Sequence, residues 1–152
     1  MVNIIHRVGI RAEIQKVYEA LATIQGISNW WTKDTSGESE IGKTVTTRFH
    51  TLEGSEVGSM RFEIKDLEPN KKIHWKFIEG PEEWIGTEVL FDLHQEENYT
   101  VVLFNHLNWS KEVEFKAHCS MKWAIFMLSL KQLIENGEGK PSPYDIKIDN
   151  WN

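Results

Sequence analysis

The sequence lacks the features that mark a secreted or membrane-spanning protein. Cys119 is the one cysteine among the 152 residues, so the chain cannot form an internal disulfide. No segment approaches the run of about 18 apolar residues that a membrane span requires. The apolar part of the N-terminus is too short for a signal peptide and alternates like a strand. We therefore expect a cytoplasmic protein without membrane insertion.

Concentrated positive charge and catalytic motifs are also missing. The formal net charge is −6, and the longest basic run is Lys71-Lys72, which argues against a nucleic-acid partner. There is no Cys-x-x-Cys, no nucleophile elbow and no glycine-rich phosphate loop. The histidines have no metal-ligand spacing: His6, His50, His74, His94, His106 and His118. We therefore predict no metal, no cofactor and no identifiable catalytic residue.

Aromatic residues, by contrast, are abundant. The chain contains seven tryptophans and seven phenylalanines. Such rings form either a filled core or the wall of a cavity for an apolar or aromatic ligand. Because rings occur on both the predicted sheet and the predicted last helix, we expect a small cavity between them.

The order of the elements predicts an α+β fold in a single domain covering residues 1–152. Alternation indicates a strand over 3–10. Helical spacing indicates a helix over 12–23, with Glu13 in its first turn, and a second short helix after a break at Gly26. A polar loop is expected over 34–40. Further strands are expected at 43–50, 57–67, 72–79, 85–94 and 99–108, and one long helix at 113–136.

This last helix is apolar around much of its circumference, so we expect it to be substantially buried against the sheet. Its main stripe includes Trp123 and Leu130, and further apolar residues widen it: Met121, Ala124, Ile125 and Leu128. The ordered core is expected to end near residue 137. The polar tail, 138–152, is expected to run over the surface, with Tyr144 or Trp151 holding it back.

Several segments resemble one known family. They are Ile4–Ile10, Val17–Leu21, Gly26–Trp31, Trp123 and Leu130–Gly137. In this order they resemble the START-like helix-grip superfamily, also called SRPBCC or Bet v 1-like, and most closely the bacterial homologues of the activator of heat-shock protein 90 ATPase. The resemblance implies a curved antiparallel sheet around a long C-terminal helix, with a cavity between them. It also implies binding of small hydrophobic molecules.

The predicted ligand-binding residues are Trp31, Phe62, Trp75, Phe77, Phe91, Phe104, His106, Trp123, Phe126 and Met127. Two alternatives stay open: a cyclase or dehydratase that uses His106, and a protein-interaction module that modulates a chaperone, the latter implied by the resemblance alone. For the adjacent tryptophans we expect Trp30 to anchor the short helix in the core, and Trp31 to lie partly exposed at the rim of the cavity.

Overall fold

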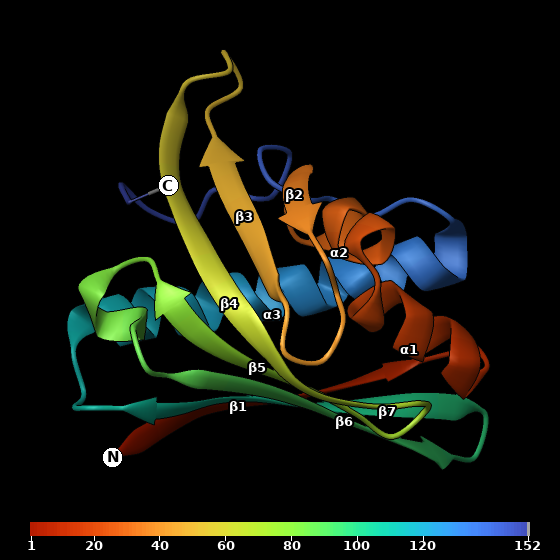
Figure 1. The fold of residues 1–152 in the computed structure, drawn as a ribbon. Coiled ribbons are helices and arrows are strands. Elements are labelled where there is room, and N and C mark those ends of the chain that lie inside the picture. Colours follow the sequence, from red (N-terminus) through yellow and green to blue (C-terminus); the bar gives the residue numbers. More distant parts are fainter. Residues whose placement is uncertain (152) are drawn as a thin grey trace.

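One antiparallel sheet of seven strands curves around a long C-terminal helix (Figure 1). The computed structural model describes residues 1–151. The sheet has the strand order β1-β7-β6-β5-β4-β3-β2. The elements are β1 Val2–Ile10, α1 Ile14–Ala22, α2 Ile24–Trp30, β2 Asp34–Gly37, β3 Thr44–His50, β4 Glu56–Glu68, β5 Lys72–Glu79, the 3-10 turn η1 Glu82–Trp84, β6 Glu88–Glu96, β7 Tyr99–Trp109 and α3 Glu114–Asn136. This is the predicted helix-grip architecture.

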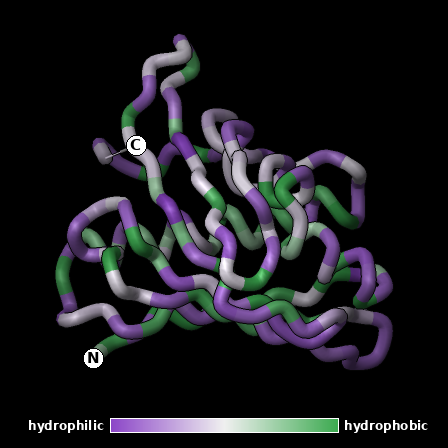
Figure 2. The backbone as a smooth tube through the Cα atoms, viewed as in Figure 1, coloured by the Kyte–Doolittle hydropathy of each residue, from purple (hydrophilic) through white to green (hydrophobic). Residues whose placement is uncertain are grey.

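The strands follow from the alternation of apolar and polar residues, visible along the chain in Figure 2. In β5, Ile73, Trp75 and Phe77 are fully buried, whereas Lys76 between them is exposed. A strand sends successive side chains to opposite faces, so one face of the sheet is apolar and must be covered. The helices cover this face (Figure 1). Within residues 1–151, no helix is long and apolar enough to cross a membrane.

The two short helices meet at a different residue from the one predicted. The break lies at Thr23, whose backbone is extended and whose Oγ1 accepts a hydrogen bond of 3.0 Å from the Gly26 backbone N–H. Gly26 itself lies inside α2, where a Cβ atom would come within 2.5 Å of the Ala20 carbonyl oxygen. Glycine therefore permits the close approach of α2 to α1. Glu13 is the N-cap residue of α1 and does not lie in its first turn.

Both adjacent tryptophans are buried, so the predicted exposure of Trp31 is wrong. Their exposed fractions are 0% for Trp30 and 2% for Trp31. Trp30 Nε1 donates a hydrogen bond of 2.9 Å to the Ala20 carbonyl oxygen. Trp31 follows the last residue of α2, and its indole ring stacks on Trp75 with 5.7 Å between the ring centroids. The chain leaves the helix at Trp31, and this allows both rings to point into the core.

The C-terminal segment, residues 140–151, does not simply run over the surface. Ser142 forms a parallel bridge with Thr32: its backbone N–H donates to the Trp31 carbonyl oxygen (2.8 Å), and its carbonyl oxygen accepts from the Lys33 N–H (3.1 Å). Ser142 is buried and Tyr144 is 61% exposed. The other expected anchor, Trp151, has its ring 6.2 Å from that of Phe115 on α3, between centroids. The pairing of Ser142 with Thr32 holds the segment beside the end of α2.

Two further predictions require correction. Residues 34–40 were expected to form a loop, but Asp34–Gly37 pairs with the edge of β3 to form β2. On α3, Trp123 and Leu130 are buried as expected, whereas Met121 and Leu128 are each 55% exposed. Because a helix lying on a sheet buries only the side that faces it, the second apolar side of α3 remains at the surface.

Candidate functional site

The space between sheet and helix is mostly filled by aromatic rings. Phe62 and Trp75 lie 4.2 Å apart between ring centroids, and Trp75 and Phe91 lie 5.0 Å apart. Phe91 in turn contacts Phe104 at 5.4 Å, and all four side chains are fully buried. Offset and edge-to-face pairs at these distances are favourable. The middle of the sheet is therefore a packed core.

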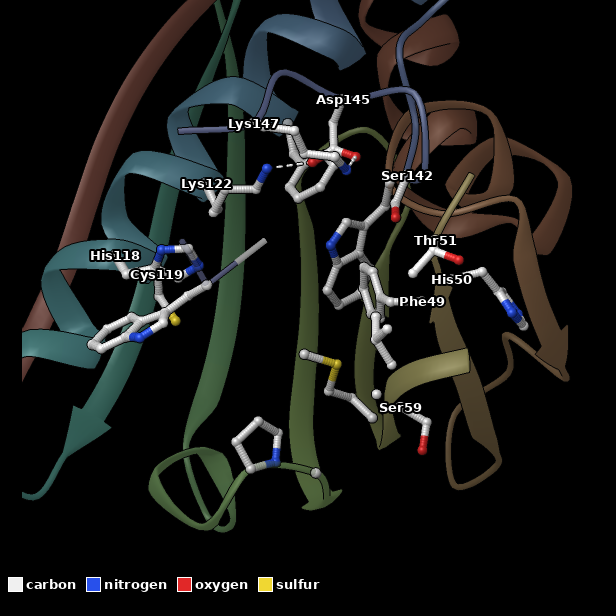
Figure 3. A pocket seen from close by; sticks show the side chains of 18 of the residues that line it. Phe49, His50, Thr51, Ser59, His118, Cys119, Lys122, Ser142, Asp145 and Lys147 are labelled. Carbon is white, nitrogen blue, oxygen red and sulfur yellow. Dashed lines mark hydrogen bonds and ion pairs between the residues drawn. The ribbon is translucent and has the colours of Figure 1, made fainter. Parts of the chain in front are cut away.

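An open cleft of about 890 Å³ lies beside this core. Figure 3 shows it between the β3–β4 hairpin on one side and the N-terminal half of α3 on the other. The C-terminal segment and the connection between β5 and β6 complete the wall. The aromatic lining residues are Trp31, Phe49, His50, Trp84, Phe115, His118, Trp123, Phe126 and Trp151.

Three of the predicted ligand-binding residues line the cleft: Trp31, Trp123 and Phe126. The other seven are buried in the core instead: Phe62, Trp75, Phe77, Phe91, Phe104, His106 and Met127. These seven side chains pack in the core and do not line the cleft. Ligand binding by the ten residues stays a prediction.

Sequence reasoning missed the lining residues outside the central strands and the buried stripe of α3. Leu52 and Val57 lie in the β3–β4 hairpin, line the cleft and are 68% and 67% exposed. Phe115 precedes the buried stripe of α3, and its ring lies 6.2 Å from that of Trp151, between centroids. Two large apolar residues flanking a turn are a signal that was present in the sequence. The contribution of Trp151 had no such signal, because it depends on where the C-terminal segment lies.

Charged groups occupy one edge of the cleft. Lys122 Nζ binds Asp145 Oδ2 (Figure 3) and donates a hydrogen bond of 2.9 Å to the Ile146 carbonyl oxygen. The same ammonium lies 5.4 Å from the centroid of the Phe126 ring. Lys147 Nζ lies 3.6 Å from Asp145 Oδ1, and only 3% of the Asp145 side chain is exposed. These contacts tie the C-terminal segment to α3.

A second polar contact joins the same two segments. His118 Nδ1 lies 2.7 Å from Asp149 Oδ2. This hydrogen bond lowers the pKa of the Asp149 carboxyl group. The His118 ring also stacks on Phe115, with 6.0 Å between centroids. The C-terminal segment is thus held at two separate points along α3.

His106 is buried in a defined hydrogen-bond chain and does not line the cleft. Trp123 Nε1 can only donate, so His106 Nδ1 accepts its hydrogen bond, at 3.1 Å. The proton of the neutral ring is then on Nε2, which donates to Thr87 Oγ1 at 2.8 Å. The Thr87 hydroxyl donates onward to the Trp84 carbonyl oxygen at 2.6 Å. Burial lowers the His106 pKa to about 3, so the ring stays neutral at physiological pH.

The remaining titratable candidates do not form a reactive group. Burial raises the pKa of the Cys119 thiol to about 12, so this cysteine is not a nucleophile near neutral pH. Among residues 1–151, no group of three or more histidine, cysteine or acidic side chains is placed to hold a metal ion.

Comparison with known proteins agrees with the architecture. The family model described as Activator of Hsp90 ATPase homolog 1-like protein matches residues 11–135. The chain belongs to this family. The Aha1 dimer from Colwellia psychrerythraea, solved in solution, is 43% identical and has a TM-score of 0.78, covering 91% of this chain and 100% of that one.

More distant structures share the fold of this AHSA1-like chain. A protein from Staphylococcus saprophyticus is 22% identical with a TM-score of 0.73, covering 91% of this chain and 95% of its own. CalU16 from Micromonospora echinospora is 20% identical with a TM-score of 0.70, covering 93% and 77%. No functionally curated protein matches the sequence significantly.

The family match ends at residue 135, before the C-terminal segment begins. Asp145, Lys147 and Trp151 nevertheless line the cleft. In this AHSA1-like chain, one wall of the cleft therefore comes from residues outside the part that the family model covers.

Proposed function

We propose that this protein binds a small apolar or aromatic molecule in the cleft between the β3–β4 hairpin and α3. The observation that carries the proposal is the open volume of about 890 Å³ with an aromatic wall, next to a core that needs no further filling. A cleft of this size and lining is typical of small-molecule sites. Family membership supports the proposal at the level of fold only.

The geometry suggests how such a ligand would be held. Its flat apolar body would lie against Trp31, Trp123 and Phe126, where each buried Å² of apolar surface is worth about 25 cal/mol. The charged edge formed by Lys122 and Asp145 would face any polar end of the ligand. Leu52 and Val57 stand at the hairpin side of the opening, where a ligand would cover their exposed side chains.

The test uses 1-anilinonaphthalene-8-sulfonate as a fluorescent probe of the folded protein. The double variant Leu52→Ser, Val57→Ser should weaken binding of this probe roughly tenfold because it removes apolar contact at the opening. Neither side chain contributes to the core, so the melting temperature should change little. The matched control is Ile41→Ser, which is 59% exposed in the parent and does not line the cleft. Failure of the probe to bind, or equal weakening in the control, would overturn the proposal.

Chaperone modulation is the second candidate, and the family match favours it. The test is the ATPase rate of the cognate heat-shock protein 90 with and without saturating protein. Stimulation would support this role, and an unchanged rate would reject it. A cyclase or dehydratase mechanism is not proposed, because both ring nitrogens of His106 are engaged and the ring lies outside the cleft.

We further infer that this chain forms a homodimer. The relative from Colwellia psychrerythraea, which is 43% identical over its whole length, is described as a dimer. We infer that, at this identity, the two proteins share the surface that joins two copies. Sedimentation equilibrium of the purified protein tests this inference directly.

A further inference from the structure

The outward side of α3 carries a continuous apolar stripe that nothing in the fold requires. Ala117, Met121, Ala124 and Leu128 follow one another at spacings of four, three and four residues, which places them on one side of a helix. Met121 and Leu128 are each 55% exposed. Ile125 lies beside them and is only partly buried. The stripe carries no charged residue over three turns.

This α3 stripe is separate from the cleft and from the core. None of its four residues lines the cleft. The buried side of the helix is formed by Trp123, Phe126 and Leu130, which face the sheet. The stripe spacing is that of a helix–helix seam, and alanines at 117 and 124 allow a second helix to approach closely. Paired large apolar residues in this pattern mark a surface for association.

We propose that the α3 stripe is the surface through which two copies of this chain associate. The proposal rests on the homodimer inferred above and names its interface. In a two-fold dimer the same surface is used by both copies. Two α3 helices crossing antiparallel near Ala124 would place Met121 against Leu128 of the partner subunit, and Leu128 against Met121 of the partner subunit. Each large side chain would then cover its counterpart.

The free edge of β1 is less suited to joining two copies. Lys131 Nζ donates a hydrogen bond of 2.6 Å to the Gly9 carbonyl oxygen on this strand. His6 Nε2 lies 3.0 Å from the Ser120 carbonyl oxygen of α3. Lys131 thus occupies a backbone acceptor of this strand, and the His6 contact holds α3 beside it, so pairing with another strand is hindered. The apolar helix stripe is left as the better candidate.

One helix stripe buries less area than a standard protein interface, so association should be weak. We expect a dissociation constant on the order of 10 µM. Sedimentation equilibrium from about 5 to 500 µM would cover this affinity. Leu128→Glu should weaken association at least about tenfold because it places an unpaired charge in the seam. Met121→Glu should act in the same way.

The matched control is Ile5→Glu on β1, whose side chain is 64% exposed on the opposite face of the sheet. It should leave association unchanged, and circular dichroism should show all variants folded. A parent protein that stays monomeric over the whole range would overturn both the homodimer and its interface. A parent dimer that Leu128→Glu leaves intact would overturn the interface alone. Binding of the fluorescent probe should be unaffected by any of these changes.

A disulfide cross-link tests the geometry independently. In a Cys119→Ala background, Ala124→Cys places a thiol at the two-fold axis, next to the same thiol of the partner subunit. Oxidation should therefore give a covalent dimer. Gln132→Cys is the control on the same side of the helix, because its distance from the axis separates the two thiols beyond disulfide reach. Cross-linking of both variants to the same extent, or of neither, would contradict the antiparallel arrangement.

Discussion

Replacing Trp31 by alanine tests the main correction that the structure makes to the sequence interpretation. A partly exposed rim residue would lose little stability on truncation. Trp31 is instead 2% exposed, and its ring contacts those of Trp75, Trp123 and Phe49 at 5.7, 5.0 and 5.7 Å between centroids. Its removal therefore opens the centre of an aromatic cluster.

The size of the loss follows from the buried area. A buried tryptophan removes about 150–250 Å² from water, which at about 25 cal/mol per Å² amounts to roughly 4–6 kcal/mol. Alanine keeps part of this contact, and water from the adjoining cleft can enter the space. We therefore expect Trp31→Ala to lower the free energy of unfolding by about 3–5 kcal/mol. Trp30→Ala should cost at least as much, because it also leaves the Ala20 carbonyl oxygen without its partner.

The assay is urea denaturation followed by far-ultraviolet circular dichroism, with the parent protein and both variants compared at the same temperature. Trp151→Ala is the control, since this residue is 49% exposed and should lose less than about 1 kcal/mol. A loss for Trp31→Ala as small as that of the control would refute the central role of this ring. If Trp30→Ala lowered the free energy of unfolding much more than Trp31→Ala, the division of roles expected from the sequence would be restored.

Three further predictions concern His106, the junction of α1 and α2, and Cys119. The His106 pKa, lowered to about 3 by burial, means that between pH 6.5 and 3 the unfolded chain binds a proton that the folded chain does not. Stability should therefore fall as pH decreases through this window, by about 2 kcal/mol from pH 7 to 5, and His106→Gln should lack this contribution. Gly26→Ala should destabilise by about 1–3 kcal/mol, since its Cβ meets the Ala20 backbone, whereas Thr23→Ala should cost about 1 kcal/mol by removing the N-cap of α2. Cys119 should resist a thiol reagent at pH 8 and react fully in urea.

Each of these has a decisive measurement. The pH effect is the difference in unfolding free energy between urea titrations at pH 7 and pH 5. An equal difference for the parent and His106→Gln would show that the buried ring titrates normally. For the helix junction, a Gly26→Ala protein as stable as the parent would mean that α1 and α2 can move apart. Cys119 borders the cleft but is 4% exposed, so rapid labelling in the folded protein would contradict its burial and raised pKa.

Most of the fold was predictable because strands and helices follow short-range patterns. Alternation in Ile73, Trp75 and Phe77 defined β5, and β3 to β7 were found with small errors at their ends. The beginning of β6 was missed, since Glu82–Trp84 forms a 3-10 turn and the strand begins at Glu88. β2 was not predictable from its own residues. Asp34–Gly37 is polar and forms a strand because the edge of β3 is there to pair with it.

The candidate site was predicted much less well than the fold. Periodicity showed that the rings of Phe62, Trp75 and Trp123 face inward, but it could not separate rings that fill the core from rings that border a cleft. For His106, periodicity likewise predicted that the side chain points inward. It could not predict the hydrogen-bond partners, because Thr87 and Trp123 come from other parts of the chain.

By itself, the sequence determined the order of the elements, the apolar face of the sheet and membership of a helix-grip family. The tertiary structure alone decided the fate of the paired tryptophans. Trp31 is buried because rings from distant parts of the chain, Phe49, Trp75 and Trp123, pack against it. Ser142 adds backbone pairing beside it. A local pattern records which side of an element is apolar, whereas burial depends on which distant segment packs against that side.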